Sequence, residues 1–157
     1  MDLVEVKQRR DKELKRHPWE LARFEIVNEL LQKLIRNDDD FSVLDIGCGD
    51  VFFISAMSDR YPKIHFYAVD TAFTDDIISH LKETTQNKKI HLFKTLDEAN
   101  QHLKKPADVV LLLDVVEHIE DDIAFLKMLN SHPAVSSETR IMITVPAFQS
   151  LFCSHDH

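Results

Sequence analysis

Acidic residues and glycines in this sequence lie at the ends of short apolar runs, where they could bind a ligand together. Asp45 lies in the run 41–46, and Gly47 and Gly49, the two glycines of the chain, follow it directly. Glycine lets a backbone turn sharply and approach a ligand closely, and amide groups at a helix start bind anions. Asp70 ends a second apolar run, and its two oxygens could accept hydrogen bonds from a pair of sugar hydroxyls. We expect these residues to share one ligand site.

A second set of ionisable residues lies at the end of the segment Asp108–His118, which contains the most hydrophobic run of the chain. Asp114 and Glu117, together with Asp45, would favour a positively charged ligand. Histidine is a common general base, so the neighbouring His118 could remove a proton from a hydroxyl group. An alternative is that the two acids cap the helix that follows and that His118 is structural. Both interpretations stay open at this point.

Apolar runs and helical patterns alternate along the chain, which predicts an α/β fold with a doubly wound, mainly parallel sheet. Strands are expected over 41–46, 64–70, 90–95, 107–113 and 139–145, with helices beginning at 51 and spanning 74–86, 97–104 and 121–130. We therefore expect a single domain over residues 1–157. It comprises an N-terminal helical segment (1–36), a βα core (41–145) and a substrate-side loop or tail (146–157).

The helical segments also predict which side chains are buried. In the first helix, expected over Trp19–Ile35, the apolar positions recur at helical spacing and include Trp19, Ala22, Ile26, Leu30 and Leu34, widened by Val27, Leu31 and Ile35. Trp19 is interpreted as a packing anchor and Arg23 as a surface charge. The helix over 121–130 is expected to bury Ile123, Phe125, Leu126 and Leu129.

Three stretches resemble motifs of class I S-adenosylmethionine-dependent methyltransferases, and they occur in the order that the family shows. Asp45-Ile-Gly-Cys-Gly49 resembles its first motif, and 67–70 and 108–118 fit the later ones, so that the resemblance covers roughly residues 17 to 157. It implies a Rossmann-like sheet whose final antiparallel hairpin is missing here. One departure is Val51, which stands where the family has a third glycine. A β-branched residue there is tolerable only if its φ is negative, and its side chain could crowd the cofactor.

The resemblance implies S-adenosylmethionine as cofactor and methyl transfer to a small-molecule or glycan acceptor, at oxygen. The glycine turn would bind the methionine end, Asp70 would bind the ribose, and residues after the second and third strands would border the adenine. The implied cofactor contacts are Asp45, Gly47, Cys48, Gly49, Asp70, Thr71, Ala72, Thr95, Leu96, Asp114 and Val115. His118 and His155 are the catalytic candidates. His118 is the possible base described above, and His155 lies in the tail 146–157, which resembles the substrate-side loop of a subgroup encoded with glycan and lipid biosynthesis.

Composition narrows the classes of function. The formal net charge is −8, which argues against a broad nucleic-acid or anionic-membrane surface. No run is long and apolar enough to cross a membrane. Cys48 and Cys153 are too few for a disulfide framework, which favours a cytoplasmic location. His155 and His157 alone are weak evidence for a metal, so no metal site is predicted.

Two other classes of protein stay open. The first is a non-catalytic, methyltransferase-like binding protein, which Val51 and the missing C-terminal strands favour. A second copy of the chain or a partner could then complete the sheet edge. The second is a nicotinamide-dependent oxidoreductase, whose fingerprint requires a glycine where Phe52 stands.

Overall fold

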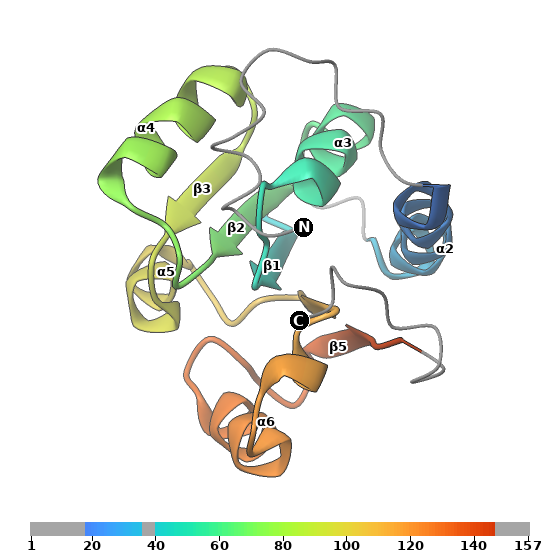
Figure 1. The fold of residues 1–157 in the computed structure, drawn as a ribbon, viewed down its shortest axis with the longest axis vertical. Helices are drawn as coiled ribbons and strands as arrows, with labels where there is room; N and C mark the ends of the chain where they lie inside the picture. The colour runs from blue at the N-terminus through green and yellow to red at the C-terminus, as the bar shows by residue number, and fades with distance from the viewer. Residues whose placement is uncertain (1–17, 36–39, 147–157) are drawn as a thin grey trace.

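The computed structural model describes residues 18–35 and 40–146, and its centre is a five-stranded sheet (Figure 1). All strands are parallel, in the order β3-β2-β1-β4-β5. The strands are β1 (Ser42–Ile46), β2 (His65–Val69), β3 (Ile90–Phe93), β4 (Val109–Leu113) and β5 (Arg140–Thr144). This confirms the predicted α/β fold, and the described part of the chain contains no antiparallel hairpin. The predictions for residues 1–17, 36–39 and 147–157 lie outside the described residues.

Helices cover both faces of the sheet. They are α2 (Pro18–Leu34), α3 (Phe52–Arg60), α4 (Asp75–Thr84), α5 (Leu96–His102) and α6 (Asp122–Ser131), with a short 3₁₀ turn, η1 (Val116–His118). Residues of α2, α3 and α4 pack into the apolar cluster on one face, and residues of α5 and α6 pack into the cluster on the other. None of the helices within the described ranges is long and apolar enough to span a membrane.

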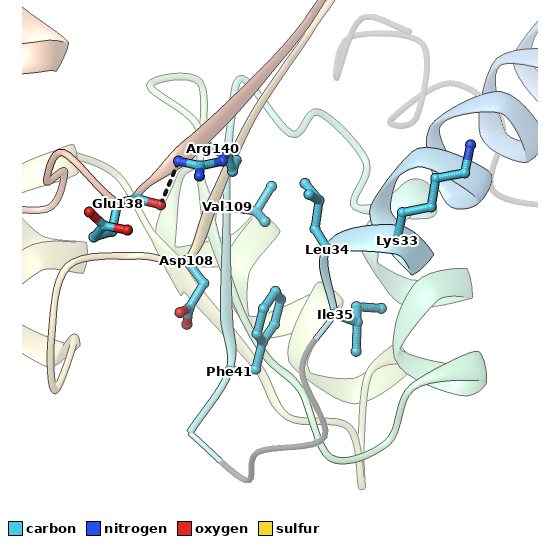
Figure 2. Close-up of a pocket in the computed structure, with 8 residues that line it drawn as sticks. All are labelled: Lys33, Leu34, Ile35, Phe41, Asp108, Val109, Glu138 and Arg140. Atoms are coloured by element: carbon cyan, nitrogen blue, oxygen red, sulfur yellow. Dashed lines mark hydrogen bonds between the residues drawn. The ribbon is translucent and has the colours of Figure 1, made fainter.

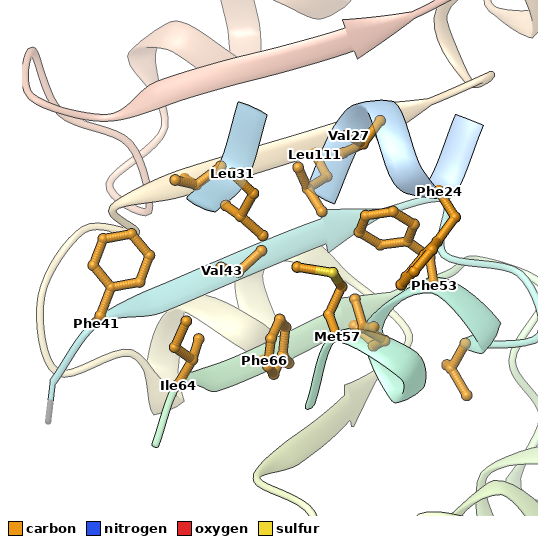
Figure 3. Packing of buried hydrophobic residues seen from close by; sticks show 14 of the residues in the cluster. Phe24, Val27, Leu31, Phe41, Val43, Phe53, Met57, Ile64, Phe66 and Leu111 are labelled. Carbon is orange, nitrogen blue, oxygen red and sulfur yellow. The ribbon is translucent and has the colours of Figure 1, made fainter. Parts of the chain in front are cut away.

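Helix α2 packs on the sheet through a face that the sequence pattern did not single out. Phe24, Val27 and Leu31 are buried in the core (Figure 3), whereas Ile26 and Leu30 are 61% and 47% exposed. The predicted stripe through Ala22, Ile26 and Leu30 is therefore wrong, although Val27 and Leu31 were predicted correctly. Apolar residues lie on more than one side of this helix, so that spacing alone does not identify the buried side. The side chain of Trp19 is outside what the structure describes.

The N-terminal half of α2 is fixed against α3 by aromatic and ionic contacts. The ring of Phe24 lies 5.3 Å from that of Phe53, centroid to centroid, in an edge-on arrangement. The guanidinium of Arg60 lies 4.8 Å from the centroid of the Phe24 ring, and it forms a 2.9 Å ion pair with Glu25. These contacts orient the adjacent residue, Arg23, relative to the carboxyl ends of the strands.

Helix α6 begins at a cap that settles one of the two interpretations of the preceding acids. The carboxylate of Asp121 accepts a hydrogen bond from the Ala124 N–H at 2.9 Å. The alternative that Asp114 and Glu117 cap this helix is therefore wrong, because both precede the cap and belong to the loop and turn after β4.

The outer side of α6 and the β5 strand expose apolar side chains. Leu129 is buried as predicted, and Phe125 and Leu126 pack partly against the core, but Ile123 is 62% exposed and was predicted wrongly. Strand β5 pairs with β4, and in the described structure its other edge has no neighbouring strand; the exposed apolar residues of this end are Ile141, Ile143 and Val145.

Candidate functional site

The turn between β1 and α3 requires glycine at Gly47 for two independent reasons. The first is its φ of +74°, a region in which side chains are strained; a hydrogen bond from its N–H to the Val69 carbonyl at 2.8 Å holds this conformation. The second is the lack of space for a side chain. A Cβ added to Gly47 would lie 2.6 Å from Cγ2 of Val115. Gly49 also has a positive φ of 56°. The predicted glycine turn is thus confirmed as a conformational requirement.

Asp70 joins this turn to the end of β2. Its Oδ2 accepts a hydrogen bond from the Gly49 N–H at 2.9 Å, and its Oδ1 accepts one from the Ala72 N–H at 2.9 Å. A carboxylate has about four lone-pair positions, so each oxygen retains the capacity for a further donor. The structure therefore brings together Gly49 and Asp70, which the sequence predicted to share one site, and fixes the orientation of the carboxylate.

Val51 contradicts the expectation that a β-branched residue here must have a negative φ. Its φ is +57°, and its side chain is only 2% exposed, within the core cluster that contains Phe24. Its N–H donates to the Cys48 carbonyl at 3.2 Å, and the next N–H, of Phe52, donates to Asp50 Oδ1 at 3.1 Å. Burial and these bonds stabilise a conformation that valine alone disfavours. The side chain fills the core, which differs from the predicted crowding of the ligand space.

Asp114 lies at the carboxyl end of β4 with a φ of +56°, and hydrogen bonds hold it there. Its N–H donates to the carbonyl of Thr144 at 3.0 Å, and the Thr144 hydroxyl donates to Asp114 Oδ1 at 2.7 Å. Its Oδ2 is bound by the guanidinium of Arg23. The carboxylate therefore connects α2, β4 and β5 at one point of the sheet edge.

Arg23 is the site residue that sequence reasoning missed. Its side chain is 24% exposed, and burial lowers the pKa of its guanidinium. The carboxylates that oppose this shift, in order of effect, are Glu20, Asp45, Glu117 and Asp50. The interpretation of Arg23 as a surface charge is therefore wrong. The available signal was its position beside Phe24 and four residues before Val27, on the side of α2 that is buried.

Asp45, in β1, is a buried ionisable group, and Cys48, within the turn, is a partly buried one. Asp45 is 2% exposed, and burial raises its pKa to about 7, an effect that Arg23 opposes and Asp70 reinforces. Burial likewise raises the pKa of the Cys48 thiol well above its usual value, so that this cysteine is a poor nucleophile. Asp45 is thus a group whose charge near neutral pH depends on what binds nearby.

The turn η1 places Glu117 and His118 next to this group. Oε2 of Glu117 is buried and has no hydrogen-bond partner in the described structure. His118 is exposed, and its N–H donates to the Val115 carbonyl at 3.1 Å. The residues predicted to border adenine follow β2 and β3 at the same edge of the sheet: Thr71, Ala72, Thr95 and Leu96. The prediction for His155 lies outside the described residues.

A hollow of about 300 Å³ lies at the other end of the strands (Figure 2). Phe41 and Asp108, which precede β1 and β4, line it together with Arg140 at the start of β5. Ligands of open α/β sheets bind outside the carboxyl ends of the strands, so this hollow is not our candidate site. No group of three potential metal ligands is assembled within residues 18–35 and 40–146.

A parallel sheet with a glycine turn after its first strand and a carboxylate after the next is typical of α/β domains that bind nucleoside-containing ligands. A family profile described as a methyltransferase domain matches residues 15–152. The chain therefore belongs to the methyltransferase-domain family, which confirms its resemblance to class I S-adenosylmethionine-dependent methyltransferases. A search of curated protein sequences found no match.

Solved structures share the fold at low sequence identity. Coclaurine N-methyltransferase, solved with N-methylheliamine and S-adenosylhomocysteine, is 19% identical with a TM-score of 0.60, over 83% of this chain and 38% of that one. A chain of the Pnkp1/Rnl/Hen1 RNA repair complex is 23% identical with a TM-score of 0.62, over 88% of this chain and 31% of that one. The plantazolicin methyltransferase BamL, solved with S-adenosylhomocysteine and a triazolic desmethylPZN analogue, is 24% identical with a TM-score of 0.56, over 76% of this chain and 44% of that one. This chain thus spans less than half of each of these proteins.

Proposed function

We propose that this chain binds S-adenosylmethionine at the carboxyl ends of β1, β2 and β4 and transfers its methyl group to an acceptor. The observation that carries the proposal is the pairing of Asp70 with the glycine turn. The Gly49 N–H at 2.9 Å orients the Asp70 carboxylate, whose remaining lone pairs suit two ribose hydroxyls. The turn itself leaves backbone amides for the methionine carboxylate.

Two further features support this proposal. Val51 is buried in the core, so the departure from the family glycine leaves the ligand side of the turn open. The acids Asp45, Asp114 and Glu117 lie near Arg23 at the β4 side, where positive charge on a ligand would be favoured. The sulfonium and ammonium groups of S-adenosylmethionine are positive charges of this kind.

Equilibrium titration of Asp70 variants tests the assignment. Asp70→Ala should weaken S-adenosylmethionine binding at least about a hundredfold, since it removes hydrogen bonds to a charged acceptor. Asp70→Asn retains one acceptor oxygen and should lose less. Asp76→Ala, an exposed aspartate of α4, is the matched control and should bind as the wild type does. Far-UV circular dichroism establishes that each variant is folded. Unchanged affinity in folded Asp70→Ala would remove Asp70 from the site.

For the acceptor we propose a hydroxyl group of a small molecule or glycan, with His118 as the base. The exposed ring of His118 is adjacent to Glu117 and close to the strand end at Asp114, and an imidazole can take a proton near neutral pH. Acceptors differ among the fold relatives, so the fold does not choose between oxygen and nitrogen. The acidic surroundings of Arg23 favour a small acceptor over a phosphate-rich nucleic acid.

A radiolabelled methyl donor and a panel of hydroxyl- and amine-bearing acceptors test this second step. His118→Ala should reduce transfer to the best hydroxyl acceptor about a hundredfold while the affinity for S-adenosylmethionine stays unchanged. His80→Ala, an exposed histidine of α4, provides the matched control. Wild-type rates in His118→Ala would exclude it as the base. The family match favours this function over the oxidoreductase alternative.

A further inference from the structure

We propose that Glu117 makes the site select its cofactor by charge, so that the sulfonium donor binds more tightly than the neutral thioether formed from it. This inference rests on the proposed function and names a specificity-determining residue for it. It is carried by the position of the Glu117 carboxylate and by the charges that surround it.

The position of η1 places Glu117 on the methyl-transfer side of the site. Cγ2 of Val115, the residue before η1, lies 2.6 Å from where a Cβ on Gly47 would be. The side chain of Val115 therefore packs against the glycine turn, and the turn η1 that follows lies on the β4 side of it. The ribose-binding candidate Asp70 is on the other side of β1, at the end of β2.

One oxygen of the Glu117 carboxylate forms no hydrogen bond within the described structure. Oε2 is buried, and no donor among the described residues forms a hydrogen bond to it. A buried carboxylate oxygen without a donor is unfavourable, and a nearby positive charge from a ligand would stabilise it. Arg23 attracts Glu117 through space, but its guanidinium is bonded to Asp114 and forms no hydrogen bond to Glu117 Oε2.

The wider surroundings have the same sign. The ionisable groups that act on Arg23 are all acidic: Glu20, Asp45, Glu117 and Asp50. Together with Asp114, these carboxylates outnumber the guanidinium of Arg23, so the net charge of this group on the β4 side of the turn is negative. Screening by water is weak in a partly buried site, which strengthens the resulting field.

Methyl transfer changes the charge of the cofactor at one atom. A lone pair of the acceptor forms the new bond to the methyl carbon, the bond from sulfur to that carbon breaks, and sulfur keeps the electron pair. The acceptor oxygen loses its proton, and the sulfonium becomes a neutral thioether. A negative field near sulfur therefore stabilises the donor and not the product, which favours release of S-adenosylhomocysteine after each transfer.

Dissociation constants measured by calorimetry for the two cofactor forms test the inference. The wild type should bind S-adenosylmethionine about tenfold or more tightly than S-adenosylhomocysteine, the order expected for one screened charge interaction. Sinefungin, which bears an ammonium group beside the position of the sulfonium, should resemble the donor. Glu117→Gln should lose about tenfold in affinity for the two cations and less than about twofold for the thioether. Glu120→Gln, an exposed neighbour, should leave all three constants unchanged.

Three results would overturn the inference. The thioether could bind as tightly as the donor and sinefungin in the wild type, which requires no variant to be folded. Glu117→Gln could weaken all three ligands equally, which would place Glu117 at the methionine ammonium that they share. It could also weaken none of them. Failure of the proposed function looks different, because a folded wild-type chain would then bind neither S-adenosylmethionine nor S-adenosylhomocysteine.

Discussion

Alanine and glycine at position 51 should differ in stability in a way that reveals the left-handed conformation of this residue. Val51 has a φ of +57° and is 2% exposed. Both substitutions remove the two buried methyl groups of valine, a loss of about 1.5 kcal/mol that they share. They differ in the penalty for positive φ, which is about 1.5 kcal/mol for alanine and absent for glycine.

A buried helical alanine with ordinary backbone geometry supplies the reference. Ala99 of α5 is 0% exposed, and it is not among the residues with positive φ. Ala99→Gly should destabilise the fold by about 1 kcal/mol or more, since glycine is the poorer helix former and loses a buried methyl. At position 51 the positive-φ penalty offsets this loss, so that Val51→Gly should be about as stable as Val51→Ala, or more stable.

Urea unfolding followed by far-UV circular dichroism measures these differences when the variants share one slope. The loss of stability from alanine to glycine should be smaller at position 51 than at Ala99 by about 1.5 kcal/mol. A glycine penalty at position 51 as large as the one at Ala99 would show that Val51 does not adopt positive φ in solution.

Three other predictions test the site and the fold. Gly47→Ala should destabilise the chain by about 3 kcal/mol in urea unfolding, from positive φ and from the contact with Val115, and the added Val115→Ala should recover only the contact part. Burial raises the pKa of Asp45 from its ordinary value of 3.8 to about 7, so the stability that it contributes at low pH is lost as the pH rises from about 4 to about 7. Asp45→Asn should therefore gain stability relative to the wild type over this range in thermal unfolding. Burial lowers the pKa of His65 and His91, so their contribution, present above 6.5, is lost as the pH falls; His91→Gln should reduce the loss of melting temperature at about pH 5.5.

The fold could be predicted because its signals are local and repeated. Each strand is a short apolar run, and caps such as Thr74, which accepts a hydrogen bond from the Ile77 N–H at 3.3 Å, mark the helix starts. The pairing of Gly49 with Asp70 followed from topology, because the carboxyl ends of parallel strands meet at one edge. These are features of residue type and order, and a sequence displays both.

The remaining features depend on contacts between distant segments. The role of Arg23 arises from Asp114, which is far away in sequence and meets it only after α2 packs on the sheet. The buried face of α2 was mispredicted because Ile26 and Leu30 have the same helical spacing as the residues that are buried. The positive φ of Val51 depends on core packing that no local pattern records.

Calorimetric titration of the whole 157-residue chain with S-adenosylmethionine, S-adenosylhomocysteine and NAD tests the central claim most directly. The glycine turn and Asp70 predict binding of the first two in the micromolar range and none of NAD. A folded chain that binds NAD, or that binds none of the three, would contradict a methyl-donor site at the carboxyl ends of β1, β2 and β4.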